Sequence, residues 1–130
     1  MRCIRTSIFT TAVLFTVSAV AQVPDDLRAA MKARDEAFYG VNSEQWEKYT
    51  AATFTTVQQD GTFMTRPVRL ANLRKQSPKP YIPRSRESNE IRGEIVMARF
   101  FSGGLWVLEI WGREAGAWKV LLSQVTTAKE

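Results

Sequence analysis

The sequence of 130 residues predicts an α+β domain in which N-terminal helices pack on a mostly antiparallel β-sheet. Apolar residues recur at helical spacing in the part of the chain that follows residue 24. The last third alternates runs rich in β-branched and aromatic residues with glycine-containing turns, as in a β-meander. Between these parts, Asp60-Gly61 separates two runs rich in threonine and phenylalanine, which is typical of a β-hairpin.

Three helices are predicted before the last strands. The first begins at Asp25, carries an apolar stripe at helical spacing and ends at Gly40. Ser43 is a suitable N-cap for a shorter second helix. A third helix is expected from about Arg66, and the proline-rich stretch that begins at Pro78 stops it.

The meander is expected to contain three strands, at about residues 90–101, 105–113 and 118–127. If both turns are two-residue loops, the register can be counted across them. Trp111 then lies opposite Val120, and Glu109 lies opposite Leu122. This register places Glu109, Trp111, Trp118 and Gln124 on one face of the sheet.

Both faces of the predicted meander are largely apolar, so both should be covered. Helices can cover one face. We expect a second copy of the chain to cover the other, which predicts a homodimer with Trp106 or Trp111 buried by the partner.

The first 21 residues have the three-part order of a secretory signal peptide. Arg2 and Arg5 form a positive start, an uncharged apolar run follows, and Ala19-Val20-Ala21 fits a small-x-small cleavage site. The run is short and rich in threonine and serine for a membrane span, and the other alternative is a buried first helix. We expect one domain over residues 22–130, secreted or periplasmic, with no membrane span.

Exported protein is therefore expected to begin at Gln22, with or without cyclisation of that residue to pyroglutamate. Intact-mass measurement of the exported fraction checks this. A mass that still includes residues 1–21 would contradict the prediction.

Composition removes several classes of chemistry from the mature domain. The chain has no histidine, and its one cysteine, Cys3, lies in the predicted signal peptide. Disulfides, cysteine–metal sites and a Ser-His-Asp triad are excluded. We expect no cofactor and no metal, and any proton transfer would depend on a carboxylate, a lysine or a tyrosine.

The charge is unevenly distributed. Between Asp60 and Glu87 there is no acidic residue, but seven arginines and lysines occur there. One interpretation is an edge that attracts an acidic ligand or membrane headgroups. The other, which we expect, is a solvated helix and loop. Nucleic acid is not an expected partner, because no aromatic residues are interleaved with these cations.

Three segments carry a resemblance to a known family: Tyr49–Phe54, Val57–Gly61 and Gly116–Thr126. With the order of predicted elements, they resemble the nuclear transport factor 2-like superfamily, and within it the small SnoaL-like domains. The resemblance covers about residues 25–127. It implies a cone-shaped α+β fold that encloses a pocket between N-terminal helices and a curved, mostly antiparallel sheet.

Members of this superfamily include ketosteroid isomerase-like, polyketide cyclase-like and dehydratase-like enzymes, and also binding and dimerisation domains without activity. The resemblance therefore implies a pocket more firmly than a reaction. Thr53 stands where relatives often have an acid, and Gln124 stands where they often have histidine. Both departures weaken the expectation of proton-transfer chemistry.

Glu109 is the one candidate catalytic residue. It lies among apolar residues in the middle of a predicted strand, where burial would raise its pKa and suit it to acid–base work. The alternative is an ion pair with Arg99, Arg113 or a partner subunit. Asp35 could be a base inside the pocket, but we expect an ordinary acid on the surface of the first helix, beside Arg34.

The candidate ligand-binding residues are an aromatic and polar set, for which the expected partner is a small apolar or aromatic organic molecule. They are Tyr49, Thr53, Trp111, Trp118 and Gln124. Ordinary core packing is the alternative for the aromatic members. Three hypotheses follow: an exported binding domain with an apolar pocket, an enzyme of the isomerase, cyclase or dehydratase kind, and a purely structural dimerisation domain.

Overall fold

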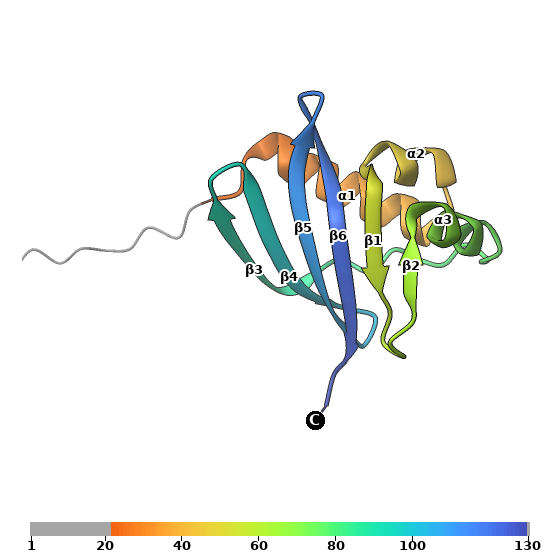
Figure 1. Ribbon diagram of the computed structural model, residues 1–130. Coiled ribbons are helices and arrows are strands. Elements are labelled where there is room, and N and C mark those ends of the chain that lie inside the picture. The colour runs from red at the N-terminus through yellow and green to blue at the C-terminus, as the bar shows by residue number, and fades with distance from the viewer. Residues whose placement is uncertain (1–21, 130) are drawn as a thin grey trace, which may run out of the picture.

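The computed structural model describes residues 22–129, which form three helices and one six-stranded sheet (Figure 1). The predicted signal peptide lies outside the described residues. The helices are α1 (Asp25–Tyr39), α2 (Ser43–Lys48) and α3 (Arg66–Arg74). The strands are β1 (Thr50–Val57), β2 (Phe63–Thr65), β3 (Ser85–Arg92), β4 (Ile95–Ser102), β5 (Leu105–Glu114) and β6 (Ala117–Thr127).

The sheet order is β2-β1-β6-β5-β4-β3, and every neighbouring pair is antiparallel except β1 and β6. The α+β class with N-terminal helices on a mostly antiparallel sheet is therefore confirmed. The hairpin around Asp60-Gly61 is also present. The Asp60 side chain accepts a hydrogen bond from the Thr62 backbone N–H, and Gly61 has a φ of +83°, which favours glycine.

Helix α1 lies across one face of the sheet, behind β5 and β6 in Figure 1. Leu27, Ala30, Met31 and Ala37 form its buried stripe, as the helical spacing predicts. The next helix differs from the prediction at its cap. Asn42, not Ser43, is the N-cap, because its side-chain oxygen accepts the Gln45 backbone N–H at 3.1 Å.

The predicted strand at residues 90–101 is wrong, because two strands occupy this region. β3 and β4 form a hairpin that turns at Gly93, whose φ is +59°. The sequence of β3, SRESNEIR, is polar and almost entirely exposed. An edge strand with so little apolar alternation gives no period-two signal.

The predicted register of β5 and β6 is confirmed at Trp111 and wrong at Glu109. Trp111 pairs with Val120 as counted, but Glu109 pairs with Ser123 instead of Leu122, because the register shifts beside Ile110 and Trp111. Leu121 is the additional residue of this bulge. A Cβ on Gly112 would lie 2.9 Å from the Leu121 Cδ1 atom, so the glycine leaves room for the bulged side chain.

The bulge divides the sheet residues between two faces. The inner face, toward α1, holds Val96, Ala98, Trp111, Trp118 and Val120, which are all buried in the core. Since Trp111 is fully buried within its own chain, the expectation that a partner buries Trp111 is wrong. Gln124 pairs with Leu108 and lies on the opposite face from Glu109.

We call that opposite face the outer face. Its side chains alternate with those of the inner face along each strand, and they are apolar mainly on β4, β5 and the neighbouring parts of β1, β2 and β6, whereas those of β3 are polar. The apolar members are Val57, Phe63, Ile95, Met97, Phe101, Trp106, Leu108, Ile110 and Leu122. Among residues 22–129 no helix crosses this face, as the front of β3 to β6 in Figure 1 shows.

Candidate functional site

Four charged side chains meet between α1 and the sheet, and we call them the buried ion cluster. They are Arg34 and Asp35 of α1, Arg84 just before β3, and Glu109 in the middle of β5. Their side chains are between 3% and 12% exposed. Two cations and two anions at such depth balance in charge, which is the condition for burying any of them at modest cost.

Glu109 is the centre of the buried ion cluster. Its Oε1 atom accepts a hydrogen bond from Arg34 Nη1 at 2.9 Å. Its Oε2 atom accepts from Arg84 Nη2 and from Trp111 Nε1, each at 2.8 Å. Three donors on one carboxylate leave little capacity for another proton or ligand.

Arg84 joins the sheet to α1 within the cluster. Its Nε and Nη2 atoms donate to the two carboxylate oxygens of Asp35 in a bidentate pair, while Nη2 also donates to Glu109. The guanidinium carbon lies 3.7 Å from the centroid of the Phe100 ring. The stacked ring partly replaces the water that this cation loses on burial.

Arg34 is held in a similar way. Its Nε atom donates to Thr50 Oγ1 at 3.1 Å, and that hydroxyl donates to the Trp46 carbonyl at 2.6 Å. The guanidinium carbon also lies 4.9 Å from the centroid of the Trp46 ring. Fixed donors and flanking rings specify one arrangement of the cluster.

The pKa of Glu109 is lowered, so the expected raised pKa is wrong. Burial alone would raise it, but the charges of Arg84 and Arg34 and the hydrogen bonds from Arg84 and Trp111 outweigh that effect. Burial also raises the pKa of Asp35, and there the Arg84 hydrogen bonds and charge offset only part of the rise. Glu109 is therefore ionised at neutral pH, and its lowered pKa makes it a weak general base.

The buried ion cluster has the form of a structural network. Every carboxylate oxygen of Glu109 and Asp35 accepts a hydrogen bond, and neither acid lines the depression beside α2 or the small hollow between Met97 and Leu108. An ion pair was the alternative for Glu109, but with Arg99, Arg113 or a partner. Of these, Arg113 bonds Asp26 instead, at 3.1 Å. A catalytic role for Glu109 stays a prediction.

Sequence reasoning missed Arg34 and Arg84 as buried residues, and it preferred a surface position for Asp35. Asp35 is not a surface acid, and Arg84 is not part of a solvated loop, because their side chains are 12% and 7% exposed. The sequence does contain a sign that Arg34 is buried. Arg34 follows Leu27, Ala30 and Met31 at helical spacing, so the apolar stripe carries a cation that needs a buried anion.

The candidate ligand-binding residues do not form one site. Trp111 contacts Glu109, and Trp118 is buried in the same core, at 0% and 9% exposure. Thr53 is exposed on β1, and Gln124 is exposed on the outer face. Tyr49 is half-buried at the start of β1 and packs against the core.

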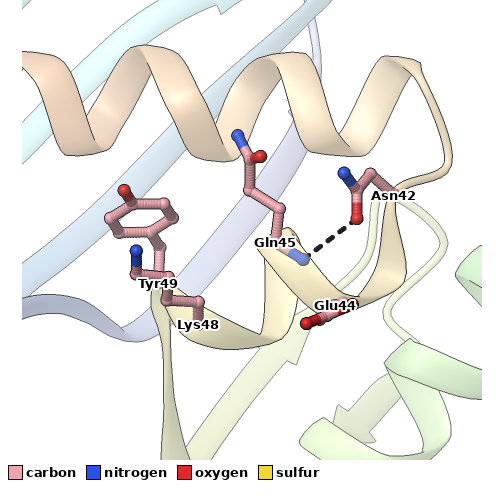
Figure 2. Close-up of a pocket in the computed structure, with 5 residues that line it drawn as sticks. All are labelled: Asn42, Glu44, Gln45, Lys48 and Tyr49. Atoms are coloured by element: carbon pink, nitrogen blue, oxygen red, sulfur yellow. Dashed lines mark hydrogen bonds between the residues drawn. The ribbon is translucent and has the colours of Figure 1, made fainter.

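Tyr49 lies on the wall of an open depression of about 550 Å³ beside α2 (Figure 2). Its lining is polar and consists of Asn42, Glu44, Gln45, Lys48 and Tyr49. The Lys48 ammonium is 5.5 Å from the centre of the Tyr49 ring. The family resemblance implies a pocket between the helices and the sheet. This depression lies elsewhere, beside α2.

Within residues 22–129, no group of histidine, cysteine, aspartate and glutamate side chains is arranged to hold a metal ion. None of the helices in that range is long and apolar enough to cross a membrane.

No family model matches the chain, and no curated protein matches it in sequence. Solved structures do match. A nuclear transport factor 2-like protein from Cytophaga hutchinsonii has a TM-score of 0.73 and 16% identity, over 80% of this chain and 97% of that chain. The chain has the nuclear transport factor 2-like fold. The fold that the sequence resemblance implies is thereby confirmed.

Two further structures with this nuclear transport factor 2-like fold are similar over nearly their whole length. A protein of unknown function in nutrient uptake from Rhodospirillum rubrum has a TM-score of 0.67 and 20% identity, covering 81% of this chain and 100% of that one. The association domain of CaMKII from C. elegans has a TM-score of 0.67 and 10% identity, covering 78% and 93%. Identities this low show the fold alone, so the SnoaL-like likeness stays a prediction.

Proposed function

We propose that this nuclear transport factor 2-like domain is a self-association domain that forms a homodimer through its outer face. The observation that carries the proposal is the large apolar surface that the described residues leave uncovered. Phe63 is 62% exposed and Leu122 is 41% exposed on this face. Large exposed apolar side chains on a sheet face that no helix covers are typical of an interaction surface.

The dimensions of the outer face suit a stable dimer. Six strands spaced about 4.8 Å apart, with about 3.3 Å per residue, span roughly 29 Å by 26 Å for strands of eight residues such as β4. That area is of the same order as the ~800 Å² per partner of a standard interface.

The charges of the outer face also permit two copies to meet. Lys119 is paired with Glu114 at 3.6 Å, and Arg92 is paired with Glu90. Arg99 pairs with Leu108 in the register of the same face and has no ion pair within residues 22–129. Cations neutralised within their own chain repel a second copy little. In a two-fold dimer each residue meets the same surface again, so charges that are compensated within one chain oppose association less than uncompensated charges do.

The filled interior favours self-association over the binding of a small ligand between α1 and the sheet. Leu27, Arg34, Glu109 and Trp111, each under 9% exposed, occupy the space between α1 and the sheet. A small organic ligand of the expected apolar kind would have to displace the buried ion cluster or use the polar depression beside Tyr49. Similarity to CaMKII association domains, from C. elegans and from Exiguobacterium sibiricum, fits the self-association proposal.

Native mass spectrometry of the protein from its own host tests both functions at once. The expected spectrum shows the mass of two mature chains and no retained molecule. A monomer at high micromolar concentration in sedimentation would overturn the dimer. A bound organic molecule of defined mass would restore the ligand-binding function. The proposed setting is the periplasm or the exterior, after removal of residues 1–21.

A further inference from the structure

The segment at residues 74–83, which we call the basic segment, contains a feature that self-association does not use. All ten residues are exposed. Three cations occur in it, Arg74, Lys75 and Lys79, and none has an ion pair within residues 22–129. Of the other four cations of the acid-free stretch, Arg66 pairs with Glu47 and Arg84 lies in the buried ion cluster. Arg69 and Arg86 lie over the rings of Phe38 and Phe101.

Two large apolar side chains follow these free cations in the same segment. Tyr81 is 37% exposed, and Ile82 is 44% exposed. Free cations alone would suit any polyanion. An exposed isoleucine and tyrosine in the same short segment favour a surface that offers negative charge and an apolar interior together, which is what an anionic bilayer offers.

The basic segment is held in place at both ends, so little order has to be gained on binding. It follows Leu73, which is fully buried, and ends beside Arg84. In the middle, the Lys79 backbone N–H donates to the Tyr39 carbonyl at 2.8 Å, and the Tyr81 ring meets the Tyr39 ring edge-on at 5.8 Å. Pro78, Pro80 and Pro83 restrict its backbone further.

The basic segment lies apart from the outer face. Its contacts with Tyr39 place it at the C-terminal end of α1, and α1 lies on the covered side of the sheet. In Figure 1 the chain between α3 and β3 passes behind the sheet with α1. A molecule that uses its outer face for a second copy therefore keeps the basic segment free.

We propose that the basic segment docks the protein on anionic lipid surfaces, with Arg74, Lys75 and Lys79 at the headgroups and Ile82 and Tyr81 in the interfacial layer. The protein is then a peripheral membrane protein with a preformed contact loop. Each cation close to such a surface contributes about fivefold to the partition constant at low salt. Three cations and two apolar anchors give a reversible attachment.

Co-sedimentation of the purified protein with vesicles tests the proposal. The probes are phosphatidylglycerol–phosphatidylcholine vesicles and vesicles of phosphatidylcholine alone, at about 0.1 M salt, where exposed charges still act over ~10 Å. We expect at least tenfold stronger binding to the anionic vesicles. The double variant Lys75→Gln/Lys79→Gln should lose about 25-fold of that binding. No binding to anionic vesicles would overturn the proposal.

Two further variants separate a bilayer from a simple polyanion. Ile82→Ser should weaken vesicle binding severalfold and leave binding to heparin unchanged, since heparin has no apolar interior. Equal loss on both probes, or no loss on vesicles, would overturn the bilayer as the partner and indicate a polyanion. Lys32→Gln is the matched control, because Lys32 is an exposed cation of α1 outside the segment, and its vesicle binding should change less than twofold. Unchanged unfolding midpoints confirm that each variant is folded.

Discussion

Replacing Glu109 by glutamine is expected to lower the free energy of unfolding by about 3–5 kcal/mol, because it leaves buried cations without their anion. The amide keeps the size of the side chain, but its nitrogen cannot accept from Arg34 or Arg84. The cluster then holds two guanidinium groups and only Asp35. Urea denaturation of the wild-type protein and the variant measures the difference through the transition midpoints.

Glu94→Gln is the matched control for this substitution. Glu94 is exposed in the β3–β4 turn and has no ion pair within the described residues, so its replacement should change stability by less than about 0.5 kcal/mol. Equal effects of the two variants would contradict the assignment of the buried ion cluster as a stabilising network. Turnover of an enolisable ketone that disappears in a folded Glu109→Gln protein would instead support the enzyme hypothesis.

The same carboxylate predicts a direction of pH dependence. The pKa of Glu109 is lowered in the folded protein, so the ionised carboxylate stabilises the fold. This stabilisation is fully present above the unfolded pKa of about 4.3, and it is lost as pH falls through the folded pKa. Asp35 has the opposite sign, since its raised pKa favours the folded state at low pH. Below about pH 4.3, wild-type stability should therefore fall more steeply than that of Glu109→Gln, and parallel curves would contradict this.

The sequence allowed the fold to be predicted where its local signals agree with the tertiary structure. The stripe of α1, the hairpin at Asp60-Gly61 and the pairing of Trp111 with Val120 are confirmed. The prediction is wrong where one residue changes the outcome. A single additional residue at Leu121 moves Gln124 to the outer face, and no pattern of period two marks such a bulge in advance.

The candidate site was harder to predict for a different reason. Glu109 alone in an apolar strand suggests a raised pKa, whereas Glu109 beside two arginines has a lowered one. Arg34 and Arg84 lie 75 and 25 positions from Glu109 in the sequence, so only the tertiary fold brings them to it. A charged residue in an apolar stripe, as Arg34 is, remains the one local sign that a buried partner exists.

Replacing Leu122 by glutamate is expected to weaken the proposed homodimer at least about 100-fold. Leu122 pairs with Ile110 and Thr55 in the middle of the sheet and is 41% exposed on the outer face. Two-fold symmetry brings two copies of the new carboxylate into one interface, where they repel each other and lose their hydration. The fold itself should tolerate the change, because the side chain already reaches solvent in the single chain.

Sedimentation velocity over a dilution series measures the change in assembly. Ile82→Glu is the matched control, since Ile82 has a similar exposed fraction of 44% but belongs to the basic segment, which bonds Tyr39 at the end of α1, so this variant should dimerise like the wild type. A Leu122→Glu protein that remains dimeric would place the interface elsewhere and overturn the outer face as the association surface. Dissociation of both variants would instead show that any added charge disrupts the assembly. If the outer face forms the dimer, Leu122→Glu should lose dimerisation and Ile82→Glu should keep it.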